Sequence, residues 1–211
     1  MIAIVDYGAG NLRSVQKGFE RNGVDALVTD DPAAIRQAAG VVLPGVGAFR
    51  DCYEGIASRG LTDIVLETID TDTPFLGICV GLQLLFTESE EGGLNPGFDV
   101  IKGAVRRFAA SEDRKVPHMG WNQIEILRRD CPLFDGVESG DFVYFVHSYY
   151  VMPSEQNVIA AVTEYGRKFC CAVWRKNLFG VQFHPEKSQH LGLRILSNFA
   201  RIVRNAQHRE A

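Results

Sequence analysis

Thr73-Pro-Phe-Leu-Gly-Ile-Cys-Val-Gly-Leu-Gln83 is the segment from which the fold is best inferred. Its first six residues are typical of a buried strand, and residues 80–89 are typical of a helix that follows at once. Cys79 therefore stands at a sharp strand-to-helix turn, with Gly77 and Gly81 two positions away on either side. Such a turn strains the backbone and leaves no room for neighbouring side chains, so it requires glycines there. The pattern is that of the G-x-S-x-G nucleophile elbow, with Cys in place of Ser.

Strand-like and helical segments alternate through the N-terminal half of the chain. The strand-like runs are short and apolar, and they cover residues 2–6, 26–29, 41–43 and 73–78. Helical patterns cover residues 11–22, 48–69 and 80–89. Strands that alternate with helices predict an α/β fold with a mostly parallel, twisted sheet flanked by helices. In such sheets ligands bind beyond the carboxyl ends of the strands, which is where Cys79 would lie.

The pattern changes in the C-terminal half, where strand-like segments follow one another closely. They cover residues 105–108, 123–127, 142–146, 158–162, 171–174 and 178–183. This spacing predicts antiparallel strands added at the edge of the same sheet. A final helix is expected after Glu186, with apolar residues at helical spacing through Val203. A single α/β domain over residues 1–205, with a polar tail at 206–211, is the simplest organisation.

The composition is that of a globular protein, and it excludes several functions. The chain has 211 residues, 46% of them hydrophobic, and 22 basic residues against 26 acidic ones give a formal net charge of −4. An acidic balance argues against nucleic acid as a partner. No apolar run reaches the roughly 18 residues needed to span a membrane. The first residues lack the basic region of a signal peptide, so we expect a cytoplasmic protein.

The cysteines indicate one or two reactive thiols and no disulfide framework. The five are Cys52, Cys79, Cys131, Cys170 and Cys171. An odd number with no C-x-x-C spacing fits neither paired disulfides nor a zinc site. We therefore expect no metal, and Cys79 is the thiol of interest. No cofactor is expected either, since Gly8-x-Gly10 lacks the third glycine of a dinucleotide-binding turn, with Arg13 at that position.

Backbone amides near Cys79 could stabilise an oxyanion. The N–H of Val80 opens the helix after the nucleophile and would be aimed at the reacting group. A second donor could come from Pro44-Gly-Val-Gly-Ala-Phe49, as the amide of Gly47 or Val46. The cysteine turn could instead hold a buried core cysteine, and the segment 44–49 could be a common strand-to-helix turn. Neither feature is therefore decisive alone.

A candidate base closes the last strand, in the segment Phe183-His184-Pro185-Glu186. Proline keeps the chain extended here, and residues two apart on an extended segment share a face. Glu186 can therefore hold the imidazole of His184 in one orientation and tautomer. The alternative is a buried histidine followed by a helix-capping glutamate. Together with the cysteine elbow upstream, the segment favours a Cys79–His184–Glu186 triad.

Several motifs taken together resemble the class I glutamine amidotransferases. Gly77-Ile-Cys-Val-Gly-Leu-Gln83 with the distant His184-Pro-Glu186 is similar to the triad motif that many of these enzymes share. Further segments resemble one branch, the glutaminase subunits of imidazole glycerol phosphate synthase in histidine biosynthesis. They are Asp6-Tyr-Gly-Ala-Gly-Asn-Leu12, Pro117-His-Met-Gly-Trp-Asn122 and Tyr144-Phe-Val-His-Ser-Tyr149. The resemblance runs from about residue 2 to about residue 200 and implies the class I amidotransferase fold.

The resemblance also implies roles for individual residues. Cys79 would attack the side-chain amide of L-glutamine and form a thioester. His184 would carry the proton to the leaving ammonia, and Glu186 would orient the imidazole of His184. The residues that would hold the glutamine are Gln83, Ser148 and Tyr149. The residues toward a partner and the ammonia path would be Asn11, Trp121, Tyr144, His147 and Lys187.

The implied partner is a cyclase subunit with a (βα)₈ barrel, in a heterodimer. It would use the ammonia to make imidazole glycerol phosphate and AICAR. Three other interpretations stay open. The chain could be the glutaminase of another synthase, such as pyridoxal phosphate synthase; it could be a stand-alone α/β cysteine hydrolase acting on esters or lactones; or it could be a non-enzymatic subunit with a relic triad and an unreactive Cys79.

Overall fold

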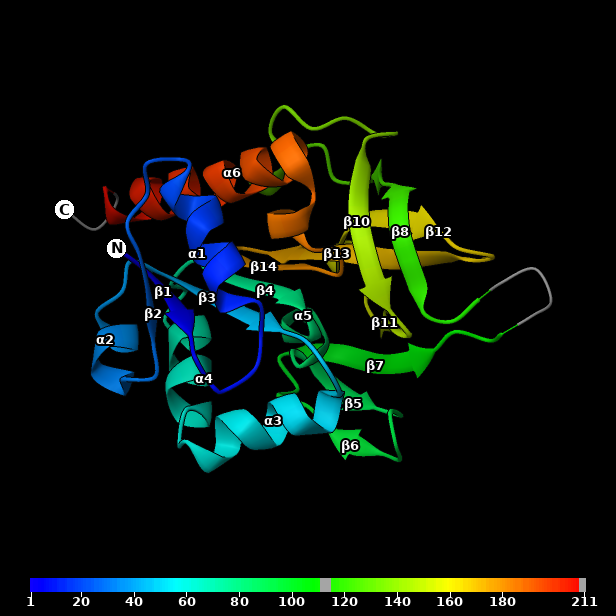
Figure 1. The fold of residues 1–211 in the computed structure, drawn as a ribbon, viewed down its shortest axis with the longest axis horizontal. Helices are drawn as coiled ribbons and strands as arrows, with labels where there is room; N and C mark the ends of the chain where they lie inside the picture. The colour runs from blue at the N-terminus through cyan, green and yellow to red at the C-terminus, as the bar shows by residue number, and fades with distance from the viewer. Residues whose placement is uncertain (111–114, 209–211) are drawn as a thin grey trace.

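A mixed β-sheet with helices on both faces forms the centre of the molecule (Figure 1). The structure is a computed structural model and describes residues 1–110 and 115–208. The helices above the sheet in Figure 1 are α1 (Leu12–Glu20) and α6 (Gln189–Gln207), and those below it are α3 (Phe49–Ser58) and α4 (Thr62–Asp70). The short helices are α2 (Pro32–Arg36), α5 (Val80–Gln83) and three 3₁₀ turns at Pro132–Phe134, Gln156–Val158 and Pro185–Lys187. The predicted single-domain α/β fold is confirmed.

Parallel strands form the half of the sheet that carries Cys79. In the described part of the chain five neighbours run parallel, in the order β2 (Ala26–Thr29), β1 (Ile2–Val5), β3 (Gly40–Gly45), β4 (Phe75–Cys79) and β14 (Leu178–Val181). All residues of β1, β3, β4 and β14 are buried, as expected for strands covered by helices on both faces. Because β4 and β14 are parallel neighbours, their carboxyl ends lie at the same edge. Cys79 ends β4, and His184 follows three residues after β14.

Antiparallel strands extend the sheet beyond β14, as predicted. They are β13 (Lys168–Arg175), β11 (Tyr149–Pro153) and β7 (Ile101–Arg107), followed by β5 (Phe86–Ser89) and β6 (Asn95–Pro96). Strands β12 (Ile159–Glu164) and β9 (Glu125–Ile126) branch from β13. One pair in this half, β5 and β7, runs parallel.

The prediction that every C-terminal strand joins the same sheet is wrong for residues 142–146. They belong to β10 (Phe142–His147), which pairs with β8 (His118–Gln123) in a separate antiparallel ribbon, here called the β8–β10 ribbon. Figure 1 shows this ribbon standing across the end of the main sheet, at the side away from both termini. The buried residues of β10 are Val143, Phe145 and His147, so only one face is covered. That alternation fits a surface layer better than an interior strand.

Two predicted boundaries are also corrected. The helix after Cys79 ends at Gln83 instead of continuing to residue 89. The carbonyls of Leu84 and Leu85 accept hydrogen bonds from the backbone of Phe98 and Ile101, and residues 86–89 then form β5. At the other end α6 continues to Gln207, so the first residues of the predicted polar tail are helical. Residues 209–211 of that tail lie outside the described residues.

Candidate active site

The turn at Cys79 has the strained geometry that the glycine pattern predicts. Cys79 has a φ of 57° and caps the N-terminus of α5, directly after β4. A Cβ atom on Gly77 would lie 2.7 Å from the carbonyl oxygen of Gly81. A Cβ atom on Gly81 would collide with the carbonyl of Leu43 in β3. Both glycines are therefore required sterically, and Cys79 holds a backbone conformation that is strained for a non-glycine residue.

His184 and Glu186 lie together next to this turn. Nδ1 of His184 is 2.8 Å from Oε1 of Glu186, and both side chains are buried. The amide of Asn11 donates a hydrogen bond of 3.3 Å to the same carboxylate oxygen. Among the described residues Nε2 of His184 and Oε2 of Glu186 have no hydrogen-bond partner. Nδ1 of the imidazole is therefore held by Glu186, and Nε2 is available to exchange a proton with another group.

The surroundings of His184 favour its charged form. Burial alone would lower the pKa of the imidazole, but the neighbouring Cys79 sulfur and the Glu186 carboxylate outweigh burial and raise the pKa to about 10. A buried cation is stable only beside compensating negative groups. The arrangement can thus hold an imidazolium beside a cysteine sulfur, as a Cys–His nucleophile requires.

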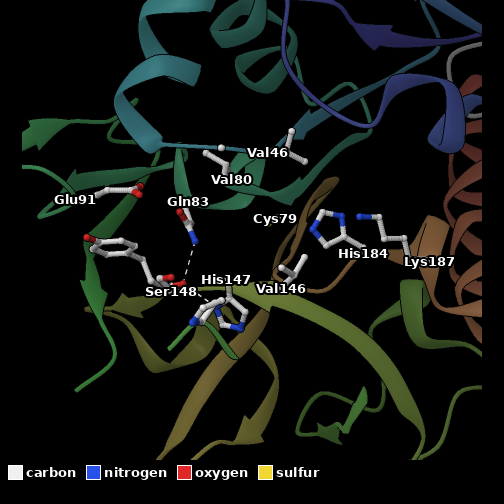
Figure 2. A pocket seen from close by; sticks show the side chains of 13 residues that line it. Val46, Cys79, Val80, Gln83, Glu91, Val146, His147, Ser148, His184 and Lys187 are labelled. Carbon is white, nitrogen blue, oxygen red and sulfur yellow. Dashed lines mark hydrogen bonds between the residues drawn. The ribbon is translucent and has the colours of Figure 1, made fainter. Parts of the chain in front are cut away.

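A cavity of about 340 Å³ opens in front of Cys79 and His184. Figure 2 shows Glu91, Gln83 and Ser148 toward one side of this cavity, and His184 with Lys187 toward the other. The other labelled lining residues are Val46, Cys79, Val80, Val146 and His147. Charged and polar groups therefore stand at both ends of a space lined in between by valines.

Gln83 is anchored inside the protein by its amide nitrogen. Nε2 donates to the carbonyl oxygen of Tyr149 and to Oε1 of Gln182, both at 3.1 Å. The amide of Gln182 in turn donates to Sγ of Cys79 at 3.7 Å. Since both Nε2 hydrogens of Gln83 are used, its side chain can meet a ligand only as an acceptor, through Oε1.

Gln182 and Glu91 are site residues that the sequence analysis missed. Gln182 stands two positions before His184 on an extended segment, a spacing that could have revealed it. Glu91 lies in the turn after β5, and its carboxylate accepts a 2.8 Å hydrogen bond from the backbone N–H of Phe49. Partial burial raises the pKa of Glu91. No local pattern marks Glu91, because it reaches the cavity through the contact of the turn after β5 with the first residue of α3.

The segment after β3 lies beside Cys79, in register with it. Gly45 pairs with Cys79 across β3 and β4, and Val46 and Gly47 line the cavity. The thiol of Cys52 donates to the carbonyl of Val46 at 3.3 Å, so the N–H of Gly47, in the same peptide unit, points away from Cys52. Val80 begins α5 directly after the cysteine. The structure thus brings together all three residues from which oxyanion donors are predicted.

The residues predicted to face a partner fall into two groups. Trp121 and Tyr144 pair across the β8–β10 ribbon, with their ring centroids 6.0 Å apart and the ammonium of Lys187 over the Tyr144 ring. Trp121 is 45% exposed. Asn11 instead contacts Glu186, and His147 is buried on the inner face of the ribbon. Ser148 and Tyr149 line the cavity where the chain passes from β10 to β11.

None of the helices in the described part of the chain is long and apolar enough to cross a membrane. Within the same residues, no group of three or more His, Cys, Asp or Glu side chains is arranged to hold a metal ion.

Fold and site together describe an α/β protein with a cysteine at the nucleophile-elbow position. The family model for class I glutamine amidotransferases matches residues 3–203. The chain belongs to this family. Among solved structures, one of a glutamine amidotransferase superposes with a TM-score of 0.75 at 18% identity, covering 96% of this chain and 99% of that chain. The structure of PurLQS from Thermotoga maritima superposes with a TM-score of 0.70 at 18% identity, covering 97% of each chain. At 18% sequence identity, the similarity to these two structures establishes a shared fold alone.

Curated relatives narrow the comparison within the class. Imidazole glycerol phosphate synthase subunit HisH from Syntrophotalea carbinolica is 59% identical over 204 residues, which cover 94% of this chain and 98% of the relative. The subunit of the same name from Geobacter metallireducens is 57% identical, with 94% and 97% covered. HisH from Archaeoglobus fulgidus is 51% identical, with 97% and 100% covered.

Proposed function

We propose that this chain is the glutaminase subunit of an imidazole glycerol phosphate synthase, and that it hydrolyses L-glutamine to glutamate and ammonia. The observation that carries the proposal is the meeting of Cys79 and His184 in a cavity large enough for one amino acid. The identities of 51–59% with HisH subunits over nearly the whole chain support the same activity.

Cys79 is the proposed nucleophile and His184 the proton carrier. The sulfur of Cys79 bonds to the side-chain carbonyl carbon of glutamine, and the C–N bond then breaks. His184 gives its Nε2 proton to the departing nitrogen, which leaves as ammonia. The neutral imidazole next takes a proton from water as the water oxygen attacks the thioester carbon, and the C–S bond breaks to release glutamate and restore the sulfur of Cys79. Glu186 keeps Nδ1 protonated throughout, so that Nε2 always faces the reaction.

The developing oxyanion is stabilised by backbone amides in this proposal. One donor is the N–H of Val80 at the start of α5. The second comes from the segment of Val46 and Gly47, whose glycines allow a peptide unit to turn toward the cavity. Donors fixed in a buried site are stabilising because they need no reorganisation as charge develops.

The far end of the cavity suits the amino-acid part of glutamine. The α-ammonium group would meet the carboxylate of Glu91 and the acceptor oxygen of Gln83. The α-carboxylate would meet the backbone around Ser148 and Tyr149. This assignment gives each charged group of the zwitterion a complementary partner and leaves its side-chain amide toward Cys79.

The exposed face of the β8–β10 ribbon is the proposed docking surface for a cyclase subunit with a (βα)₈ barrel. This face carries Met119, Trp121 and Tyr144, and Lys187 lies beside Tyr144. Aromatic residues and methionine are enriched at protein interfaces, so Met119, Trp121 and Tyr144 support this assignment, while Lys187 would lie toward the rim. The proposed complex is a heterodimer in which ammonia passes to the barrel, where imidazole glycerol phosphate and AICAR form.

A reducing compartment such as the cytoplasm is proposed as the location. All five cysteines are free, including the adjacent Cys170 and Cys171. Unpaired buried thiols of this kind are usual where glutathione keeps cysteines reduced.

The test is a glutaminase assay of the chain alone and with the cyclase subunit and its nucleotide substrate. We expect glutamate release from L-glutamine to rise when partner and nucleotide are both present. Equal response to the barrel of pyridoxal phosphate synthase would favour the glutaminase of another synthase. Turnover of esters or lactones without L-glutamine turnover would favour a stand-alone hydrolase, and no turnover with normal partner binding would favour a relic triad.

A further inference from the structure

Two buried histidines lie outside the proposed triad and face each other directly. His118 in β8 and His147 in β10 occupy paired positions in the ribbon, and Nδ1 of His118 is 3.0 Å from Nε2 of His147. Their residues are only 3% and 6% exposed. Neither imidazole takes part in the reaction steps proposed for Cys79 and His184. A buried polar pair of this kind is costly unless every nitrogen is satisfied, so the location of each proton matters.

The carbonyl oxygen of Tyr149 determines where the protons lie. It is 2.7 Å from Nδ1 of His147, and because a carbonyl only accepts, this nitrogen must carry the proton. In a neutral ring Nε2 of His147 is then an acceptor, so Nδ1 of His118 must be the donor between the two histidines. The chain of hydrogen bonds therefore has one direction, from His118 through His147 to Tyr149.

The other end of the chain is equally constrained. Nε2 of His118, now an acceptor, receives a 3.2 Å hydrogen bond from the amide of Asn122. The same amide nitrogen donates to the carbonyl of Glu164 at 2.8 Å, so both of its hydrogens are used. The ring of His118 is also stacked against Phe145 and Tyr165, at centroid distances of 4.8 and 4.1 Å. Its orientation is fixed by packing as well as by hydrogen bonds.

Both imidazoles stay neutral at physiological pH. Burial lowers the pKa of His118 to about 4. Burial also lowers the pKa of His147 to about 3, against the opposing effect of its hydrogen bond to Tyr149. A proton added to either ring would leave two donors facing each other, which the geometry does not accommodate.

The chain of hydrogen bonds continues into the cavity. The carbonyl of Tyr149 that accepts from His147 also accepts from Nε2 of Gln83. Gln83 donates as well to Gln182, which donates to the sulfur of Cys79. A continuous network of hydrogen bonds thus connects the two histidines to the sulfur of Cys79.

We propose that His118 and His147 are positioning residues, a directional hydrogen-bond relay that holds the Tyr149 carbonyl and, through it, Gln83 in the geometry that binds glutamine. This inference rests on the proposed glutaminase function. It gives the two histidines a role in substrate binding that neither the reaction steps nor the docking surface requires. Because the relay lies on the inner face of the β8–β10 ribbon, it also links the position of that ribbon to the glutamine cavity.

The proton positions can be measured without any substrate. In NMR spectra of the imidazole nitrogens of the chain alone near pH 7, we expect both His118 and His147 to be neutral and protonated on Nδ1. A neutral imidazole free in water prefers the proton on Nε2, so this result is not expected by default. A proton on Nε2 of either ring would overturn the relay, whatever the enzyme's substrate is.

Variants in the holoenzyme test the role. His147→Phe keeps an aromatic ring but removes the donor to Tyr149, and His118→Phe removes the donor to His147. We expect each to raise KM for L-glutamine, about tenfold for His147→Phe, while ammonium-dependent synthesis stays unchanged. His147→Asn places an amide N–H near the position of Nδ1 and should recover most of the loss. Phe145→Leu, the matched control, loses one of the two rings stacked on His118 but keeps Tyr165 and every hydrogen bond of the relay, so it should lower stability without raising KM.

A second readout separates this inference from the proposed function. Cys79 is alkylated in each variant by iodoacetamide, which needs no glutamine pocket, and by a chloroketone analogue of glutamine. We expect His147→Phe to slow the chloroketone about tenfold and iodoacetamide little. Equal slowing of both reagents, or an unchanged KM in both Phe variants, would overturn the relay. A wild-type protein that reacts with iodoacetamide but with neither L-glutamine nor the chloroketone would instead contradict the proposed function.

Discussion

Nδ1 of His184 lies 2.8 Å from the carboxylate of Glu186, while Nε2 of the same ring has no partner among the described residues. The carboxylate oxygen is an acceptor, so Nδ1 carries a proton and Nε2 is the atom free to exchange one with Cys79 or a substrate. The two residues are separated by a single proline, so the local chain places them together, and the amide of Asn11 holds the same carboxylate oxygen. It is the geometric basis of the mechanism proposed here.

The ionisation of His184 provides the first prediction. Its pKa of about 10 means that the imidazolium persists through neutral pH and is lost only as the pH rises toward that value. We expect the His184 resonances in NMR to titrate far above the ordinary histidine value near 6.5. Glu186→Gln, and alkylation of Cys79, should each lower the midpoint because each removes one of the two neighbouring groups that raise the pKa of His184. A midpoint near 6.5 in the unmodified protein would contradict the assignment.

The sequence predicted the parts of the site that are fixed by neighbouring residues. Cys79 between two glycines, and His184 two positions before Glu186, are arranged as their spacing indicates. Glu91 could not be found in this way, because long-range packing brings it to the cavity from the turn after β5. Gln182 could have been found, since it shares the extended face of His184.

Two incorrect predictions about the fold also concern features that depend on contacts beyond the local sequence. The helix expected over residues 80–89 ends at Gln83 because the carbonyls of Leu84 and Leu85 bond to the backbone of residues 98 and 101, and the chain then pairs with β7. The β8–β10 ribbon was assigned to the main sheet because the spacing of strands along the chain says nothing about which layer they join. The spacing along the chain predicts no strand over residues 118–122, although their pairing with β10 places His118 beside His147.

The second prediction concerns the elbow. Gly81→Ala should destabilise the protein by more than about 4 kcal/mol or prevent folding, because its new methyl group meets the Leu43 carbonyl inside the core. Gly60→Ala is the matched control. Gly60 has a φ of 66° and open space around it, so the change should cost only about 1–2 kcal/mol. Urea denaturation measures both, and equal stability of the two variants would show that the elbow is not sterically closed.

The third prediction distinguishes the five cysteines. Burial raises the pKa of Cys52, raises that of Cys131 to about 11 and raises that of Cys170 to about 12. These thiols stay protonated and unreactive near neutral pH, whereas Cys79 faces a cavity beside an imidazolium. Brief treatment of the native protein with iodoacetamide should therefore modify Cys79 alone, as read by mass spectrometry of peptides. Comparable labelling of the other four would argue against a specially reactive thiol.

The fourth prediction concerns the docking surface. Trp121→Ala should weaken binding of the cyclase subunit by about 2 kcal/mol or more, roughly thirtyfold in Kd, because exposed aromatic anchors dominate interface energies. Leu27→Ala is the control, since Leu27 is similarly exposed but lies on β2 at the opposite end of the sheet. It should change Kd by less than about twofold. Calorimetric titration measures both, and equal effects would place the interface elsewhere.

The central claim is that Cys79 releases ammonia from glutamine for a partner that consumes it. Its most direct test is Cys79→Ala in the complex with the cyclase subunit, assayed once with L-glutamine and once with an ammonium salt. We predict that glutamine-dependent synthesis falls by about 10⁴-fold or more, while ammonium-dependent synthesis stays within about twofold of the unmodified complex. Retention of glutamine-dependent synthesis by Cys79→Ala would contradict the account.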